Sequence, residues 1–144
     1  MRPMGFVLLL SLAACGEEGN SLDGSVQVSL GYDRVTTRLI SDDLEIRYLR
    51  DVSGGAEEVA ELVVNDVGPM LAPDLDVALT QKNASVGRSV TDGSGFPDLE
   101  EGTLVIEEGG EVGDVPRGRF GVVFVTGTTL SGHFSSTLEE VSLQ

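Results

Sequence analysis

Alternation of apolar and polar residues, broken at short intervals by glycine, is the feature that most constrains this chain. Apolar residues occupy every second position in three stretches, 26–32, 44–48 and 75–79, and Leu104 and Ile106 form a shorter example. A period of two sends successive side chains to opposite faces of a β-strand, so each stretch predicts a strand with one buried and one solvated face. The 19 glycines suit turns between strands, because a glycine inside a helix costs about 1 kcal/mol relative to alanine.

One stretch has a composition that also suits a helix. Residues 56–64, AEEVAELVV, contain good helix formers, but the stretch is short and follows the turn-like DVSGG of residues 51–55. We therefore favour a hairpin of 44–50 with 58–64 over a helix. Pro69 and Pro73 mark a loop or crossover. Residues 81–102 are the least regular part, and we expect a long excursion there with one short strand near 86–90.

The C-terminal part repeats a short pattern. Gly-x-Phe occurs at 118–120 and again at 132–134, which predicts a hairpin of 118–126 with 129–138. Alternation then places one set of side chains toward the core: Phe120, Val122, Phe124, Leu130, Phe134, Ser136 and Leu138. About eight strands in antiparallel hairpins predict an all-β, two-layer β-sandwich. Residues 122–125 are apolar on both faces, so a small β-barrel is the alternative.

The first 14 residues have the features of an export signal. Arg2 is followed by an apolar centre and by the small residues Ala13 and Ala14. The run from Met4 to Ala14 has 11 residues, whereas a membrane-spanning helix needs about 20. We therefore expect three parts: a signal peptide at 1–14, a modified cysteine with a flexible, polar tether at 15–24, and a single domain at 25–144.

The end of this segment resembles a bacterial lipobox. Leu12, Ala13 and Ala14 lead directly to Cys15, the one cysteine of the chain. The resemblance implies that Cys15 receives a diacylglyceryl thioether and becomes an acylated N-terminus. Two or more acyl chains bind a membrane stably, whereas one binds only marginally. An unmodified thiol at Cys15 is the alternative.

The chain as a whole resembles small exported bacterial lipoproteins of unknown function that close with a Gly-x-Phe strand pair. The resemblance implies the cell envelope as the compartment, and Gly16 in place of aspartate favours the outer membrane. The net charge of −15 would repel nucleic acid and anionic surfaces. Nucleic-acid binding is therefore not expected, and the acidity serves solubility.

Candidate metal ligands gather in one irregular segment. Asp92, Asp98, Glu100 and Glu101 bring four carboxylates together, and calcium prefers oxygen ligands on such loops. Their spacing departs from that of the EF-hand, and the simpler interpretation is a set of solvated turns. His133, the only histidine, is predicted to point outward. It has no G-x-S-x-G elbow to serve, so we expect no catalytic residue. One histidine and one lipidated cysteine leave only carboxylates as further zinc ligands, so we expect no zinc site.

These observations favour one function class over two others. We expect a membrane-anchored, non-enzymatic β-sandwich that binds another envelope protein or glycan, or that contributes to envelope structure. The alternative is a calcium- or glycan-binding module that uses residues 92–101. An enzyme with a pair of acid/base carboxylates is a third hypothesis, since such pairs have no sequence signature.

Overall fold

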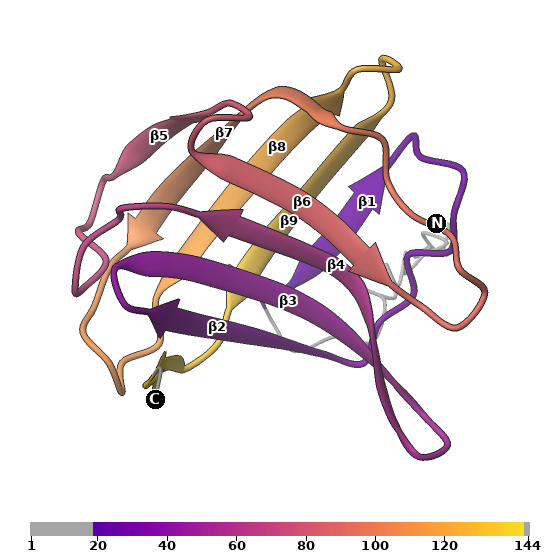
Figure 1. Cartoon of the computed structure of the whole chain (residues 1–144). Coiled ribbons are helices and arrows are strands. Elements are labelled where there is room, and N and C mark those ends of the chain that lie inside the picture. The colour runs from indigo at the N-terminus through magenta and orange to yellow at the C-terminus, as the bar shows by residue number, and fades with distance from the viewer. Residues whose placement is uncertain (1–18, 143–144) are drawn as a thin grey trace, which may run out of the picture.

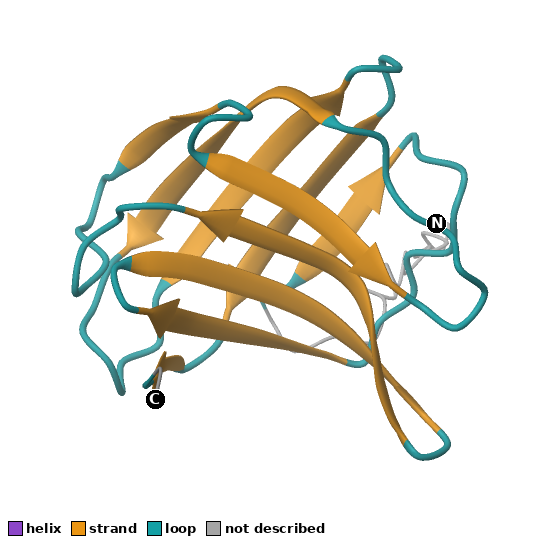
Figure 2. Cartoon of the chain, viewed as in Figure 1, coloured by secondary structure: helices purple, strands orange, loops and turns teal. Residues whose placement is uncertain are grey.

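The computed structural model describes residues 19–142, which fold into two facing five-stranded sheets (Figure 1). No α-helix occurs in this range (Figure 2). Sheet A has the strand order β1 (Ser21–Gly24), β9 (Thr129–Ser135), β8 (Arg117–Phe124), β7 (Leu99–Glu108) and β5 (Asp76–Leu79). Sheet B has the order β10 (Leu138–Val141), β2 (Arg34–Ile40), β3 (Asp43–Val52), β4 (Gly55–Val64) and β6 (Ala84–Ser89).

The core lies between the two sheets, as a sandwich requires. Each sheet contributes its apolar alternate positions, and the largest fully buried side chains come from both: Leu39, Leu44, Ile46 and Tyr48 from sheet B, and Leu104, Ile106, Phe124, Leu130 and Phe134 from sheet A. The predicted two-layer sandwich is confirmed. The two sheets stay separate, so the barrel alternative is wrong.

Both predicted hairpins are confirmed. Strands β3 and β4 pair antiparallel with Ile46 opposite Leu62, so residues 56–64 are a strand and the helix alternative is wrong. Strands β8 and β9 pair antiparallel with Phe120 opposite Gly132. Tertiary pairing overrides helix-forming composition here because the alternate apolar residues of β4 reach the core.

The predicted strand at 26–32 is wrong. Residues 25–33, which we call the end loop, connect β1 in sheet A to β2 in sheet B and cross one end of the sandwich (Figure 1). Val26, Leu30 and Tyr32 are half-buried against the core, so the alternation does mark an inner and an outer side. The backbone changes sheets at this point, so it bonds to neighbouring strands only at its two ends, where the Ser25 N–H donates to Thr129 and the Asp33 N–H donates to Leu49.

Three predicted boundaries also need correction. Residues 21–24, assigned to the tether, form edge strand β1, in which Ser21 pairs with His133 and Gly24 with Leu130. Residues 99–102, assigned to the long excursion, belong to β7. The second strand of the C-terminal hairpin, predicted to run to residue 138, ends at Ser135. Ser136 is half-buried beyond it, and Leu138 is buried as predicted but begins β10 of sheet B.

One strand pair is parallel. Strand β10 runs parallel to β2, with Leu138 opposite Thr37, whereas the sequence predicted antiparallel hairpins throughout. The chain leaves sheet A after β9 and enters sheet B within two residues. Ser136 supports this crossing because its hydroxyl lies 2.5 Å from the Thr37 hydroxyl.

Tyr48 ties the two sheets together across the core. Its hydroxyl, on β3 of sheet B, donates a 2.6 Å hydrogen bond to the carbonyl oxygen of His133 on β9 of sheet A. Gly132 makes the approach possible, because a Cβ there would lie 2.6 Å from the Tyr48 hydroxyl oxygen and 2.8 Å from the Ser21 carbonyl oxygen. Burial raises the pKa of Tyr48, so the phenol stays protonated and keeps this bond.

Candidate functional site

The predicted lipidation residue, Cys15, lies outside the described residues. The first described residue is Gly19, four positions further along the chain. A fully extended chain advances at most about 3.6 Å per residue. The Cα atom of Cys15 is therefore at most about 14 Å from that of Gly19.

The acidic segment predicted to bind calcium is arranged mainly by its own hydrogen bonds. Asp92 accepts hydrogen bonds from the Ser94 backbone N–H, at 2.8 Å, and from the Ser94 hydroxyl, at 2.6 Å. These two bonds lower the pKa of the Asp92 carboxyl, with a smaller contribution from Arg88. This is a local turn in which the side chain caps its own backbone.

The structure does not gather the four predicted carboxylates around one point. Asp98 is exposed just before β7, and Glu100 and Glu101 are exposed on β7 itself, beside a bulge in its pairing with β8. In the part of the chain that the structure describes, no three His, Cys, Asp or Glu side chains are grouped closely enough to hold a metal ion.

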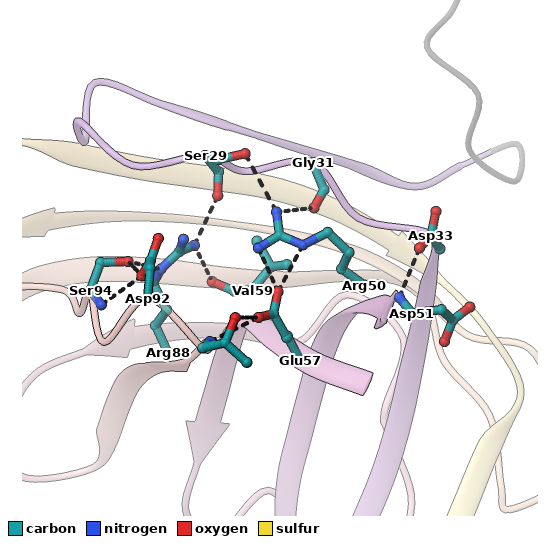
Figure 3. Close-up of polar contacts among 11 residues, drawn as sticks. Ser29, Gly31, Asp33, Arg50, Asp51, Glu57, Val59, Arg88, Asp92 and Ser94 are labelled. Carbon is teal, nitrogen blue, oxygen red and sulfur yellow. Dashed lines mark hydrogen bonds and ion pairs between the residues drawn. The ribbon is translucent and has the colours of Figure 1, made fainter. Parts of the chain in front are cut away.

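A polar cluster fixes the end loop over one end of the sandwich (Figure 3). Arg88, on β6, donates to the Ser29 carbonyl at 2.9 Å, to the Val59 carbonyl at 3.1 Å and to the Ser94 hydroxyl at 3.0 Å. Its guanidinium carbon also lies 5.8 Å from the centre of the Phe96 ring. Burial lowers the pKa of Arg88, although Asp92 and Glu57 oppose that shift. Arg88 thus joins the end loop, β4 and the 92–98 segment.

A second arginine in this cluster pairs with a buried carboxylate. Arg50 donates two hydrogen bonds, of 2.9 and 2.7 Å, to Oε2 of Glu57. The Thr91 backbone N–H and hydroxyl donate to the other oxygen. The Thr91 bonds, followed by those from Arg50, lower the pKa of Glu57 to about 2. Because Arg50 also reaches the Ser29 hydroxyl and the Gly31 carbonyl, both at 3.4 Å, the cluster is a structural clamp on the end loop.

The outer face of sheet B carries a row of ion pairs. Glu45 is only 7% exposed and lies between Arg38 and Arg47, whose Nε atoms are 2.8 and 3.2 Å from its Oε1. Arg47 also pairs with Glu58 at 3.3 Å. Burial, with the neighbouring charges of Glu58 and Glu45, raises the pKa of Glu61 to about 6.

The outer face of sheet A carries a pocket of about 250 Å³ where β1 begins. His133 is exposed there, as predicted. Its Nδ1 lies 3.0 Å from the Ser21 hydroxyl oxygen, which also accepts the His133 backbone N–H at 3.1 Å. These two contacts between Ser21 and His133 hold the start of β1 against β9.

No family model, no curated protein and no solved structure matches this chain.

Sequence reasoning missed the buried charges and the pocket. Glu45 falls at a polar position of the alternating pattern, where a residue is expected to be solvated. Glu57 is buried on the same side of its strand as Val59, and Arg88 is half-buried on the same side as Val86. One signal was available: Arg50 and Glu57 lie almost symmetrically about the turn of the hairpin, which makes them cross-strand partners. The pocket brings together residues from β1, β7, β8 and β9, and no local pattern joins these.

Proposed function

We propose that this chain is a bacterial envelope lipoprotein, anchored through acyl chains on Cys15, whose β-sandwich has a non-enzymatic binding or structural role. The observation that supports the proposal is the apolar run and LAAC sequence that end four residues before the first described residue. A domain joined so directly to a lipid anchor works at a membrane surface. No helix within residues 19–142 is long and apolar enough to cross a membrane.

The contact made by the single histidine fits a structural role. The Ser21 hydroxyl oxygen lies 3.0 Å from His133 Nδ1 and also accepts the His133 backbone N–H, so Ser21 is tied into the pairing of β1 with β9. The pair acts as a cross-strand contact that fixes the first strand of the domain, close to the proposed anchor.

Intact-mass analysis of protein purified from its native host tests the anchor. We expect loss of residues 1–14 and the added mass of a diacylglyceryl group plus one acyl chain. A matched Cys15→Ala variant is expected to leave the membrane fraction, and it removes the only sulfhydryl of the chain. An uncleaved start, or an unmodified thiol in the native host, would contradict the proposal.

Cross-linking in the native envelope, followed by purification of the lipidated protein, tests the binding role. The Cys15→Ala variant serves as the control, since it keeps the whole sandwich and lacks only the proposed anchor. We expect a cross-linked partner that is recovered with the lipidated protein and not with the Cys15→Ala variant. Turnover of an envelope component by the purified domain would instead indicate an enzyme.

A further inference from the structure

The pocket at the start of β1 lies closest along the chain to the proposed anchor. Gly19, Asn20 and Ser21 line it on one side, and His133, Arg117 and Glu107 line it on the other. Gly19 is four residues from Cys15, a span of at most about 14 Å. If Cys15 carries acyl chains in a bilayer, this pocket lies within reach of the lipid head groups.

The pocket presents donors suited to a phosphate. Arg117 is about half exposed, and its guanidinium carries five N–H groups. One of its nitrogens, Nη2, donates to Glu108 at 2.8 Å. His133 Nδ1 lies 3.0 Å from the Ser21 hydroxyl oxygen, and when that nitrogen accepts the hydroxyl proton, Nε2 carries the ring hydrogen and can donate it to a ligand. An arginine and an imidazole N–H are both charge-assisted donors to a phosphate oxygen.

The same pocket presents an acceptor suited to a cation. Oε1 of Glu107 accepts a hydrogen bond from Arg119 at 3.0 Å, and the Glu107 side chain is 37% exposed. The second carboxylate oxygen can accept from an ammonium group. Two arginines and two glutamates, Arg117 with Glu108 and Arg119 with Glu107, make the local charge close to zero in a chain that is otherwise strongly acidic.

We propose that this pocket binds a zwitterionic phospholipid head group of the phosphoethanolamine kind. The phosphate accepts hydrogen bonds from Arg117 and His133, and the ammonium donates to Glu107. The proposed site rests on the proposed anchoring at Cys15 for its place at the membrane surface. Such a contact would hold the sandwich in one orientation on the membrane, which a flexible lipid anchor alone does not do.

The only histidine of the chain gives a single reporter for this site. The protein from the native host is labelled with ¹⁵N, held in a maltoside detergent, and titrated with soluble glycerophosphoethanolamine. The His133 ring signal is expected to shift and to saturate. Inorganic phosphate and ethanolamine alone are each expected to bind at least about fivefold more weakly, because each offers only one of the two charges. Glycerophosphocholine, whose quaternary ammonium has no N–H for Glu107, is expected to bind more weakly as well.

Variants separate the site from a general effect on charge. Arg117→Gln and Glu107→Gln are each expected to weaken glycerophosphoethanolamine binding about fivefold or more. Arg34→Gln is the matched control, since Arg34 is similarly exposed and pairs with Asp51 on the other sheet. Thermal melting confirms that each variant is folded.

Two results would overturn the head-group site: no saturable shift of His133, or an equal affinity for inorganic phosphate and glycerophosphoethanolamine. Both readouts are made in solution with soluble probes, so they do not depend on acylation of Cys15. An unmodified Cys15 together with saturable binding would contradict the proposed anchor and leave the binding site standing.

Discussion

The two sheets use their surface arginines in different ways. On sheet B, Arg38 and Arg47 flank Glu45, and the three side chains are only 9 to 23% exposed. On sheet A, the side chains of the pairs Arg117–Glu108 and Arg119–Glu107 are between 37 and 60% exposed. Screening by water leaves an exposed pair with little effect on stability, whereas a buried carboxylate such as Glu45 needs the two cations beside it to compensate for its lost hydration. The ion pairs around Glu45 on sheet B are therefore structural, whereas the exposed pairs of sheet A remain available to a ligand. The Arg34–Asp51 pair of sheet B, with side chains 48 and 58% exposed, is similar to those of sheet A.

Removing the central carboxylate of sheet B is expected to have the largest effect. Glu45→Ala leaves Arg38 and Arg47 facing each other without their shared partner and is expected to lower the free energy of unfolding by about 2–3 kcal/mol. Urea denaturation followed by circular dichroism measures the change. A loss below about 0.5 kcal/mol, the level of an exposed pair, would show that the two sheets do not differ in this respect.

The bond between the sheets is expected to rank second. Tyr48→Phe leaves the His133 carbonyl without its 2.6 Å partner in the core and is expected to cost about 1–2 kcal/mol. Tyr32→Phe is the matched control, because Tyr32 is half-buried at the edge of the core and packs edge-on against Tyr48. Equal losses in the two variants would mean that the cross-sheet bond contributes nothing specific.

The free energy of unfolding is expected to depend on pH through Glu61 of sheet B, with a smaller effect whose sign follows from its pKa. The pKa of Glu61 is raised from 4.5 to about 6, so the folded state favours its protonated form. Stability from this group is present below pH 4.5 and is lost as the pH rises through 6. The loss is expected to be below about 1 kcal/mol, because water still reaches the side chain.

Glu61→Gln isolates that effect. The variant is expected to be slightly more stable than the parent at pH 7 and to lack the decline between pH 4.5 and 6. The opposite shift at Glu57, to about 2, acts only below pH 4.5 and does not overlap with this range. Denaturant titrations at three pH values measure the difference between the two proteins, and an identical decline in both would contradict the assignment to Glu61.

Breaking an exposed pair of sheet A is expected to have the smallest effect. Glu108→Ala removes the 2.8 Å partner of Arg117 and is expected to change the free energy of unfolding by less than about 0.5 kcal/mol. Comparison with Glu45→Ala in the same denaturation assay sharpens the contrast between the sheets. If Glu108→Ala lowered the free energy of unfolding as much as Glu45→Ala does, the Arg117–Glu108 pair would be needed for stability. That result would weaken the proposed role of Arg117 in binding.

The sequence predicted the parts of the fold in which pattern and pairing coincide. The β3–β4 and β8–β9 hairpins follow directly from alternation on both sides of a short turn. The end loop shows the limit of that reasoning: Val26, Leu30 and Tyr32 alternate because one side packs on the core, yet the backbone pairs with no strand. Alternation reports burial, and hydrogen bonding depends on whether a neighbouring strand is present.

The sequence could not predict strand β1 or the pocket beside it, because both depend on contacts between distant parts of the chain. The four residues of β1, SLDG, are too few to show an alternating pattern. They form a strand because they hydrogen-bond to the edge of β9. The pocket beside it depends on side chains more than 100 positions apart, such as Ser21 and His133. The acidic segment, by contrast, could be recognised in the sequence. In the structure its Asp92 accepts two hydrogen bonds from Ser94 and so stabilises a local turn.

The contact between Tyr48 and Gly132 also has an evolutionary consequence. Any side chain at 132 would collide with the phenol, with the backbone of β1 and with Phe120. A shorter side chain in place of the tyrosine removes only one of these collisions, because the Ser21 carbonyl and Phe120 stay in place. In homologous sequences we therefore expect glycine to persist at 132 even where position 48, 84 residues away, has changed.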